Sequence, residues 1–336
     1  MSPAAVRSLE VLLENVSIRG STDVGSLVGW NEGAVSNVWV TGNVTGRGET
    51  GGLVGVNHGT ISESRVEGTV TDVWGGSVGG LVGENFDTIS NCHADAVVTS
   101  SSSYAGGLVA SNYGIITESS AVGSVQGLSY VGGLVGYNND GTIIDECYAA
   151  GNATGTETGI FSYTIVGGLV GLNRGSISNS YARGDVSGQE DIGGLVGSNG
   201  DVGSIINCYS TGRVTGSSYI GGLVGYSHPS GIITDSYWDA STSQQGQSAG
   251  GTGKNTAEMK QRATYENWDF AGVWGINGSD NDGYPFLRWQ AYEAVPVVPS
   301  KPLNLTAMPG NGEVKISWSA PADDGGSSII RYEVCK

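Results

Sequence analysis

Residues 166–173 read VGGLVGLN, and this octapeptide reveals the period on which the chain is built. The motif occurs eight times, and its first Gly lies at positions 25, 51, 79, 106, 132, 167, 193 and 221. Successive copies are therefore 26, 28, 27, 26, 35, 26 and 28 residues apart, and the longest step holds an insertion around residues 155–163. A period of this length is typical of architectures in which each repeat packs on its neighbours.

The second half of each repeat predicts a half-buried strand. From Ser180 to Ser187, small or apolar side chains alternate with polar ones, as in a strand with one inward face. Eight such units of about 26 residues, rich in Gly and β-branched residues, predict an all-β fold: a parallel β-solenoid with coils about 4.8 Å apart. A propeller blade needs about 40 residues, so the shorter period favours the solenoid. The number of sheets in each coil stays open.

Gly and Asn define the motif. Gly accounts for 58 of the 336 residues, and we expect the periodic ones to serve corners with positive φ and close approaches between backbones. Asn closes the motif in seven of eight copies, and Ser227 replaces it in the last. Because stacked side-chain amides can hydrogen-bond to one another, we predict a buried ladder of Asn31, Asn57, Asn85, Asn112, Asn138, Asn173 and Asn199.

Composition excludes several classes of partner. The chain has 15 Lys and Arg against 32 Asp and Glu, a net charge of −17. Because no basic stripe is available to neutralise phosphates, we expect no binding of nucleic acid. No apolar run reaches the roughly 18 residues of a membrane span, and the first 20 residues lack the pattern of a signal peptide.

The repeat, GGLVGxN followed by GxIxxSYAxGxVxG, resembles the GLUG repeat of bacterial and archaeal surface proteins. The resemblance covers about residues 15–240. It implies an extracellular or cell-surface β-solenoid, often one segment of a longer multidomain protein, with no settled activity of its own.

The chain divides into five parts. Residues 1–20 are expected to end a preceding coil, residues 21–236 to form the solenoid, and residues 237–292 to form an aromatic cap over its end. Within the cap, Asn255 and Glu258 have the spacing of a capping box and predict a short helix to about Arg262. Residues 293–301 are a Pro-rich linker. Residues 302–336 resemble the start of a fibronectin type III domain, a partial β-sandwich.

That resemblance places strands around residues 303–307 and 314–318 and from Ile329, with Trp318 as the core tryptophan. Both ends of the chain look truncated, so we expect a fragment, and a monomer in that form.

Three of the four Cys residues fall in one inward column. Cys92, Cys147 and Cys208 lie in the third, fifth and seventh copies, so the closest pairs are about 9.6 Å apart by coil spacing. This distance exceeds the roughly 7 Å limit for Cα atoms joined by a disulfide, and we predict buried free thiols and no metal site.

A first outward column ends in four tyrosines, Tyr148, Tyr181, Tyr209 and Tyr237, one in each successive copy. These residues are named the tyrosine column below. Two interpretations stay open. An aromatic stripe could stack on sugar rings and bind a glycan, and an aromatic ladder also stabilises a sheet without binding anything.

The best catalytic candidates lie in the second and third copies. Arg65 would stand beside His93, and Glu67 beside Asp95, on one face and one coil apart. Two carboxylates about 5 Å apart meet the distance requirement of a retaining glycosidase. The alternative is an ion-pair cluster at the surface, with two cations and two anions.

Two weaker sites complete the candidates. An outward column rich in Thr could suggest ice binding, and Thr is also a favourable strand residue; it contains Thr45, Thr71, Thr99, Gln126, Thr154, Ser187 and Thr215. In NGSDNDG, residues 277–283, Asp280 and Asp282 partly resemble a calcium loop, but the distal Glu is missing, and a turn is the alternative.

These patterns favour a noncatalytic extracellular or cell-surface module that spaces and displays domains, with adhesion to glycans, cell surfaces or matrix as its possible partners. The rival hypotheses are a carbohydrate-active β-helix enzyme that uses Glu67, Asp95 and His93, and an ice-binding face. No cofactor is expected, apart from the calcium candidate.

Overall fold

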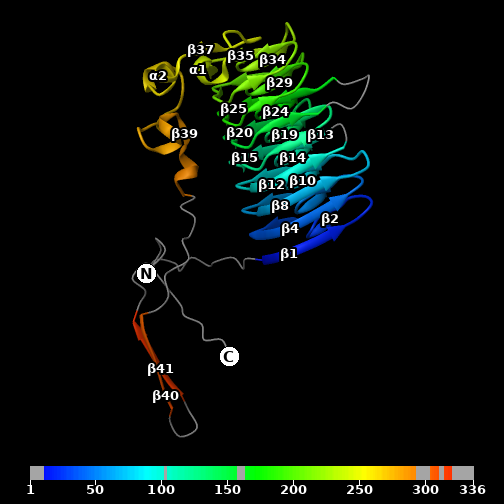
Figure 1. The fold of residues 1–336 in the computed structure, drawn as a ribbon, viewed down its shortest axis with the longest axis vertical. Helices are drawn as coiled ribbons and strands as arrows, with labels where there is room; N and C mark the ends of the chain where they lie inside the picture. The colour runs from blue at the N-terminus through cyan, green and yellow to red at the C-terminus, as the bar shows by residue number, and fades with distance from the viewer. Residues whose placement is uncertain (1–10, 102–103, 157–162, 293–302, 310–313, 320–336) are drawn as a thin grey trace. The chain divides into compact units, whose positions relative to one another are not determined.

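The computed structural model describes residues 11–101, 104–156, 163–292, 303–309 and 314–319, which form two compact units (Figure 1). The first unit comprises residues up to 269 together with 276–285, and the second comprises residues 270–275 and those from 286 onward. The first is a parallel β-solenoid of eight coils with a C-terminal extension, which confirms the predicted fold class.

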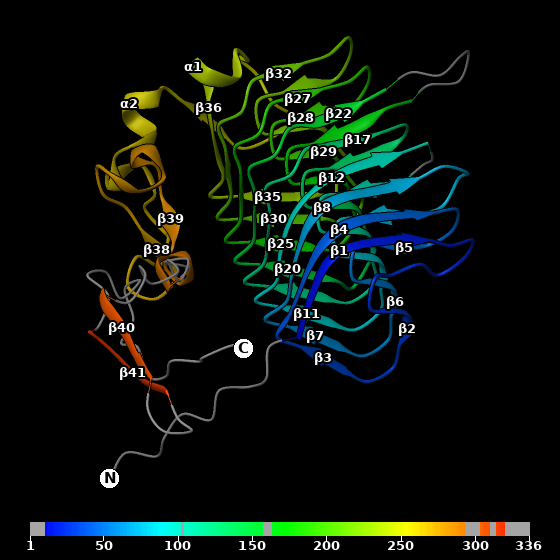
Figure 2. The same ribbon diagram turned by 60° about the horizontal axis from the view of Figure 1, so that its bottom comes forward.

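Each coil contributes to four parallel sheets, in chain order (Figures 1 and 2). The first sheet contains β5 (Thr50–Gly51), β9 (Val78–Gly79), β13 (Tyr104–Gly106), β18 (Tyr130–Gly132), β23 (Ile165–Gly167), β28 (Ile192–Gly193) and β33 (Ile220–Gly221). The second sheet holds the last four residues of each motif: β2 (Val28–Asn31), β6 (Val54–Asn57), β10 (Val82–Asn85), β14 (Val109–Asn112), β19 (Val135–Asn138), β24 (Val170–Asn173), β29 (Val196–Asn199) and β34 (Val224–Ser227).

The third sheet is built from three-residue strands: β3 (Ala34–Ser36), β7 (Thr60–Ser62), β11 (Thr88–Ser90), β15 (Ile115–Thr117), β20 (Ile143–Asp145), β25 (Ser176–Ser178), β30 (Ser204–Ile206) and β35 (Ile232–Thr234).

The fourth sheet is the widest and it forks. It begins with four long strands, β1 (Val11–Arg19), β4 (Val38–Gly46), β8 (Arg65–Asp72) and β12 (His93–Ser100). Beyond β12, one branch contains β16 (Ser120–Ala121), β21 (Tyr148–Ala149), β26 (Tyr181–Ala182), β31 (Tyr209–Ser210), β36 (Tyr237–Asp239) and β37 (Thr252–Lys254). The other contains β17 (Val125–Gly127), β22 (Ala153–Gly155), β27 (Val186–Ser187) and β32 (Val214–Thr215). β1 pairs with β4 in parallel, so the N-terminal segment adds one strand to this sheet ahead of the first motif.

Identical positions of successive coils stack to form the core. Val and Leu of each motif and the central residue of each third-sheet strand, Val35 in β3 and Ile in the others, point inward, and from the second coil to the seventh they are fully buried. Leu27, in the first coil, is 39% exposed because no coil covers it among the described residues.

The predicted Asn ladder is confirmed. Each Asn Nδ2 donates to the Oδ1 of the Asn in the next coil, over six consecutive bonds of 2.7–2.9 Å from Asn31 to Asn199. In four of the seven, the Oδ1 also accepts from the backbone N–H two residues later, as in Asn112 and Gly114, and in Asn138 it accepts from the Thr142 hydroxyl instead. The ladder therefore fixes both the register of the coils and the turn that follows each motif.

Corners and close approaches use different residues, which corrects the expectation for Gly. The corner between the third and fourth sheets has a positive φ of 43–56° in all eight coils. It is occupied by Asn37, Glu63, Asn91, Glu118, Glu146, Asn179, Asn207 and Asp235. The motif Gly residues instead allow close backbone approach, since a Cβ on Gly133 would lie 2.0 Å from the carbonyl oxygen of Gly168.

Residues 240–254 cover the C-terminal end of the stack. Helix α1 (Ala240–Ser243) is capped by Asp239, whose Oδ1 accepts from the N–H groups of Ser241 and Thr242. The Ser248 hydroxyl accepts from Val224 N–H, and β37 pairs with β36.

The sequence did not suggest α1. The predicted helix is confirmed as α2 (Thr256–Met259), with the capping box of Asn255, followed by η1 (Arg262–Thr264) and η2 (Asp280–Gly283).

The second unit holds two antiparallel pairs. In the first, β38 (Trp274–Gly275) pairs with β39 (Phe286–Leu287), and η3 (Arg288–Tyr292) follows. In the second, β40 (Leu303–Pro309) pairs with β41 (Val314–Ser319), at the two strand positions predicted from the fibronectin resemblance. Trp318 is 37% exposed in this hairpin and is not enclosed by a core. The linker at 293–301 and the strand from Ile329 lie outside the described residues.

We predict that Asn112→Ala lowers the free energy of unfolding by about 3 kcal/mol, because the amides of Asn85 and Asn138 and the backbone of Gly114 each lose a buried hydrogen-bond partner. Asn31→Ala is the matched control, since Asn31 bonds to a single neighbouring Asn and should cost about 1 kcal/mol. Urea unfolding followed by circular dichroism measures both. Equal losses at the two positions would contradict a cooperative ladder.

Candidate functional site

The tyrosine column has the predicted register. Tyr148, Tyr181, Tyr209 and Tyr237 pair in sequence on β21, β26, β31 and β36. The rings of the first three stack with centroids 5.1 and 4.9 Å apart and planes within 9° of parallel. Each inner ring therefore has both faces covered by its neighbours.

The chain itself covers the middle of this column, which favours the interpretation as a structural ladder over that of a glycan-binding stripe. Tyr181 is 2% exposed and Tyr209 is fully buried. The Tyr209 hydroxyl donates to the carbonyl of Pro285 at 2.6 Å and accepts from Asn281 Nδ2 at 2.7 Å. Part of the predicted cap thus lies along the side of the solenoid rather than over its end.

Three further contacts hold this segment against the side. Arg183, on the coil of Tyr181, pairs with Asp282 and donates to Asn281. The Tyr284 hydroxyl donates to the buried carboxylate of Asp239 at 2.7 Å. The Trp268 indole donates to the carbonyl of Asp235 at 2.9 Å. Ionic, polar and aromatic contacts therefore cover Tyr181 and Tyr209, whereas Tyr148 and Tyr237 are half-buried.

The catalytic candidates are brought together as predicted. His93 pairs with Arg65, and Asp95 with Glu67, on β12 and β8. Arg65 Nη2 lies 2.8 Å from Glu67 Oε1, so the guanidinium already neutralises one of the two carboxylates. Asp95 is exposed. The arrangement is that of a surface ion pair beside the exposed carboxylate of Asp95. It does not have the features of a carboxylate pair enclosed in a cleft.

His93 does not supply the second cation of the predicted cluster. Burial, and then the charge of Arg65, lower the pKa of His93 to about 4. Its Nδ1 is 2.7 Å from the Ser120 hydroxyl. The imidazole is therefore neutral at pH 7. Because its pKa is about 4, it is a weak base and accepts a proton inefficiently at that pH.

The calcium candidates are engaged elsewhere. Asn277 Oδ1 accepts from the backbone N–H groups of Ser279 and Asp280, which is the turn that was the alternative interpretation. Asp282 pairs with Arg183, and this contact lowers the pKa of its carboxyl. In the described part of the chain, no three acidic, His or Cys side chains converge as metal ligands would.

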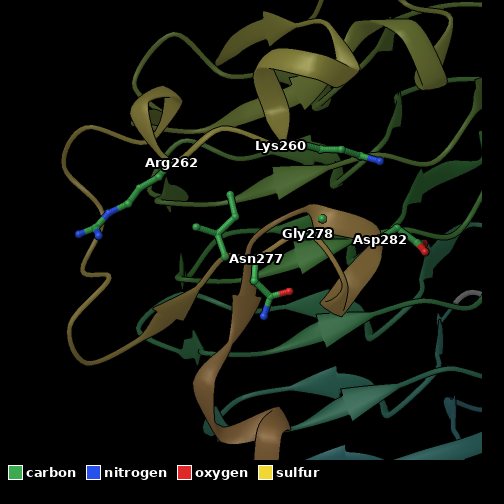
Figure 3. Close-up of a pocket in the computed structure, with 7 residues that line it drawn as sticks. Lys260, Arg262, Asn277, Gly278 and Asp282 are labelled. Carbon is green, nitrogen blue, oxygen red and sulfur yellow. The ribbon is translucent and has the colours of Figure 1, made fainter.

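A pocket lies beside this turn (Figure 3). It has a volume of about 350 Å³ and is lined by Lys260, Arg262, Ile276, Asn277, Gly278, Asp282 and Gly283. The Lys260 Nζ lies 4.9 Å from the ring centre of Tyr284. The pocket lies far along the chain from the catalytic candidates.

The Cys residues are structural. Cys92, Cys147 and Cys208 are buried, as predicted, and form no disulfide. Burial raises the pKa of all three thiols, that of Cys92 to about 12. They alternate with Ser along one column, and each Cys N–H donates to a Ser hydroxyl of the next coil at 3.0–3.1 Å. Cys335 lies outside the described residues.

The Thr-rich column also has the predicted register, from Thr45 to Thr215. Its residues range from half-buried to exposed, and ice binding stays a hypothesis.

The sequence analysis missed a second set of aromatic rings, next to the Asn ladder on the second sheet. Trp30 precedes its Asn, whereas His58, Phe86 and Tyr113 follow theirs. His58, Phe86 and Tyr113 share one column, the position after the Asn, and only Trp30 meets its neighbour diagonally. The signal was an aromatic residue beside the Asn in successive copies.

Tyr209→Phe should lower the free energy of unfolding by about 1–2 kcal/mol, because a buried hydroxyl with two partners is lost. Tyr237→Phe, in the same column but half-buried, should change it by less than about 0.5 kcal/mol. Thermal and urea unfolding of the two variants provide the measurement. If Tyr209→Phe were as neutral as its control, the side contact would not form in solution.

The His93 pKa predicts a loss of stability in mild acid. The unfolded chain takes up a proton near pH 6.5, whereas the folded chain resists it until about pH 4, so this contribution is lost as the pH falls through that window. NMR titration of the ring should show the shifted pKa, and His93→Gln should flatten this part of the stability profile. A ring that titrates near pH 6.5 would contradict the burial.

Comparison with known proteins agrees with the repeat structure. The profile of the GLUG motif matches residues 75–99, 127–154, 162–187 and 188–215. Each matched segment ends in the fourth sheet, on β12, β22, β27 or β32.

Two other proteins are similar to the chain. A "Putative Gly-rich membrane protein" of Evansella cellulosilytica is 38% identical over 162 residues, which are 46% of this chain and 15% of that protein. The chain thus spans under a sixth of the length of that relative. A solved structure described as a "putative immunoglobulin A1 protease" from Bacteroides ovatus is 20% identical, with a TM-score of 0.42 over 83% of this chain and 75% of that one.

Among the described residues, no helix has both the length and the hydropathy to cross a bilayer. The conclusion that the comparisons support is one of repeat type: the β-solenoid of this chain carries GLUG motif repeats.

Proposed function

We propose that this chain is a noncatalytic module of an extracellular or cell-surface protein, and that it holds neighbouring domains a fixed distance apart. The observation that carries the proposal is the unbroken register of eight coils, in which the Asn ladder and the backbone bonds continue past the insertion before the sixth motif. A continuous ladder makes a stiff rod, since bending it would stretch buried hydrogen bonds.

The arrangement of the candidate sites supports a structural role over an enzymatic one. Arg65 neutralises Glu67, His93 has a low pKa, and the chain itself covers the middle of the tyrosine column. The acidic surface suits an extracellular setting, because a net charge of −17 opposes self-association. The description of the relative as a membrane protein favours the same setting.

Spin labels on Ser36 and Thr234, which lie in equivalent positions seven coil steps apart, test the stiffness. We expect one narrow distance distribution near 34 Å, from seven steps of about 4.8 Å. Deletion of residues 106–131 removes one 26-residue repeat in register and should shorten the distance by about 5 Å. Cys92, Cys147 and Cys208 are buried and should not take up the label, and Cys335, which lies outside the described residues, is replaced by Ser in the labelled chain.

The control is a deletion of residues 106–118, which breaks the register and should unfold the coils on either side. A broad distribution in the intact chain would contradict the spacer. Hydrolysis of a glycan panel by the intact chain, abolished in Glu67→Gln and Asp95→Asn, would establish the rival enzyme.

A further inference from the structure

A strip of seven aromatic rings runs along the outer surface of the first five coils. Trp30, His58, Phe86 and Tyr113 stack in order, with ring centres 4.5, 4.4 and 4.7 Å apart. Tyr113 then meets Tyr137, which also contacts Tyr104 and Tyr130. These seven residues are named the aromatic strip. Five of the seven rings lie on the second-sheet strands or directly after them, and these strands, from β2 to β19, follow one another along the stack in Figure 1.

The first four rings of the strip are exposed, whereas Tyr104, Tyr130 and Tyr137 are half-buried. Trp30 is 48% exposed, Phe86 39% and Tyr113 37%, and His58 is also exposed. A continuous exposed aromatic surface on a soluble domain usually marks a site of interaction. Because the stacked rings cover one another's faces, the surface offered to a partner consists mainly of ring edges and tyrosine hydroxyls.

Carboxylates line the strip. Glu32 Oε1 accepts from the Trp30 indole at 3.1 Å, and Asp87 is exposed next to Phe86. Glu84, two residues before Phe86, is half-buried. Burial, together with the charges of Glu49 and Asp23, raises the pKa of its carboxyl. Residues 20–140 contain eleven Asp and Glu against two Arg and no Lys. The potential over the strip is therefore negative.

This charge and ring geometry discriminate among partners. A second copy of the chain would bring two carboxylate rims together, and nucleic acid or an anionic lipid surface would be repelled in the same way. A sugar ring stacks on an exposed aromatic face, and those faces are occupied within the stack. A cationic partner with apolar stems matches both features, because Lys and Arg stems cover apolar surface while their charged ends reach carboxylates.

We propose that the aromatic strip and its carboxylates form a docking surface for an extended polypeptide segment rich in Lys and Arg. From Trp30 to Tyr137 the strip spans four coil steps, about 19 Å. An extended hexapeptide is about 20 Å long, so six residues match the strip end to end. The proposal is independent of the spacer role, since a stiff rod needs no ligand.

The test uses the full chain and a fluorescein-labelled hexa-arginine peptide, followed by fluorescence anisotropy in about 0.1 M salt. Hexaglutamate is the charge-reversed probe. Glu32→Gln with Asp87→Asn should weaken hexa-arginine binding roughly three- to tenfold, and Phe86→Ser with Tyr113→Ser about tenfold. All four side chains are exposed, so the fold should survive, and circular dichroism checks this.

Matched variants on other surfaces control for net charge and lost aromatic area. Glu63→Gln with Asp95→Asn removes two exposed carboxylates away from the strip, and Trp74→Ser removes a ring that is 77% exposed. Both should change affinity less than twofold. Equal weakening by these controls, no binding at millimolar peptide, or equal binding of hexaglutamate would overturn the proposal. The proposal would also be overturned if the chain self-associated or bound glycans and if Phe86→Ser with Tyr113→Ser abolished that binding.

Discussion

The buried amide of Asn is the interaction on which the other features of the solenoid depend. Inside the stack there is no water to satisfy it, so its partners must come from the turn that follows and from the coils on either side. Asn112 finds all of them, in Gly114, Asn85 and Asn138. A slip of one residue between two coils would leave several buried polar groups unpaired, at a cost of several kcal/mol.

Because the register is fixed, equivalent positions of successive repeats lie side by side and form columns along the rod. This is why the repeat alone predicted the inward Ser and Cys column, the tyrosine column and the pairing of Glu67 with Asp95. Periodicity determines which side chains are neighbours on the rod. It does not determine what covers them, because that depends on contacts without a period.

The C-terminal extension shows this limit. Asn281 reaches Tyr209 across 72 positions of sequence, and residues 277–283 carry no signal that they lie along the side of the rod. The repeat therefore predicted the stacking of Tyr181 and Tyr209 but not their burial. The same limit applies to His93, whose low pKa depends on burial beside Arg65 and not on residue type.

The corner residues show a different limit. Gly is the residue that tolerates positive φ best, yet all eight corners use Asn, Asp or Glu. Gly is needed between the first and second sheets, where a carbonyl lies 2.0 Å from the position of any Cβ on Gly133 and no side chain fits. At the corner, by contrast, a side chain costs only about 1–2 kcal/mol and points to solvent. Gly therefore occupies the positions where sterics exclude every other residue. The corners can instead hold Asp and Glu, which carry part of the acidic charge of the surface.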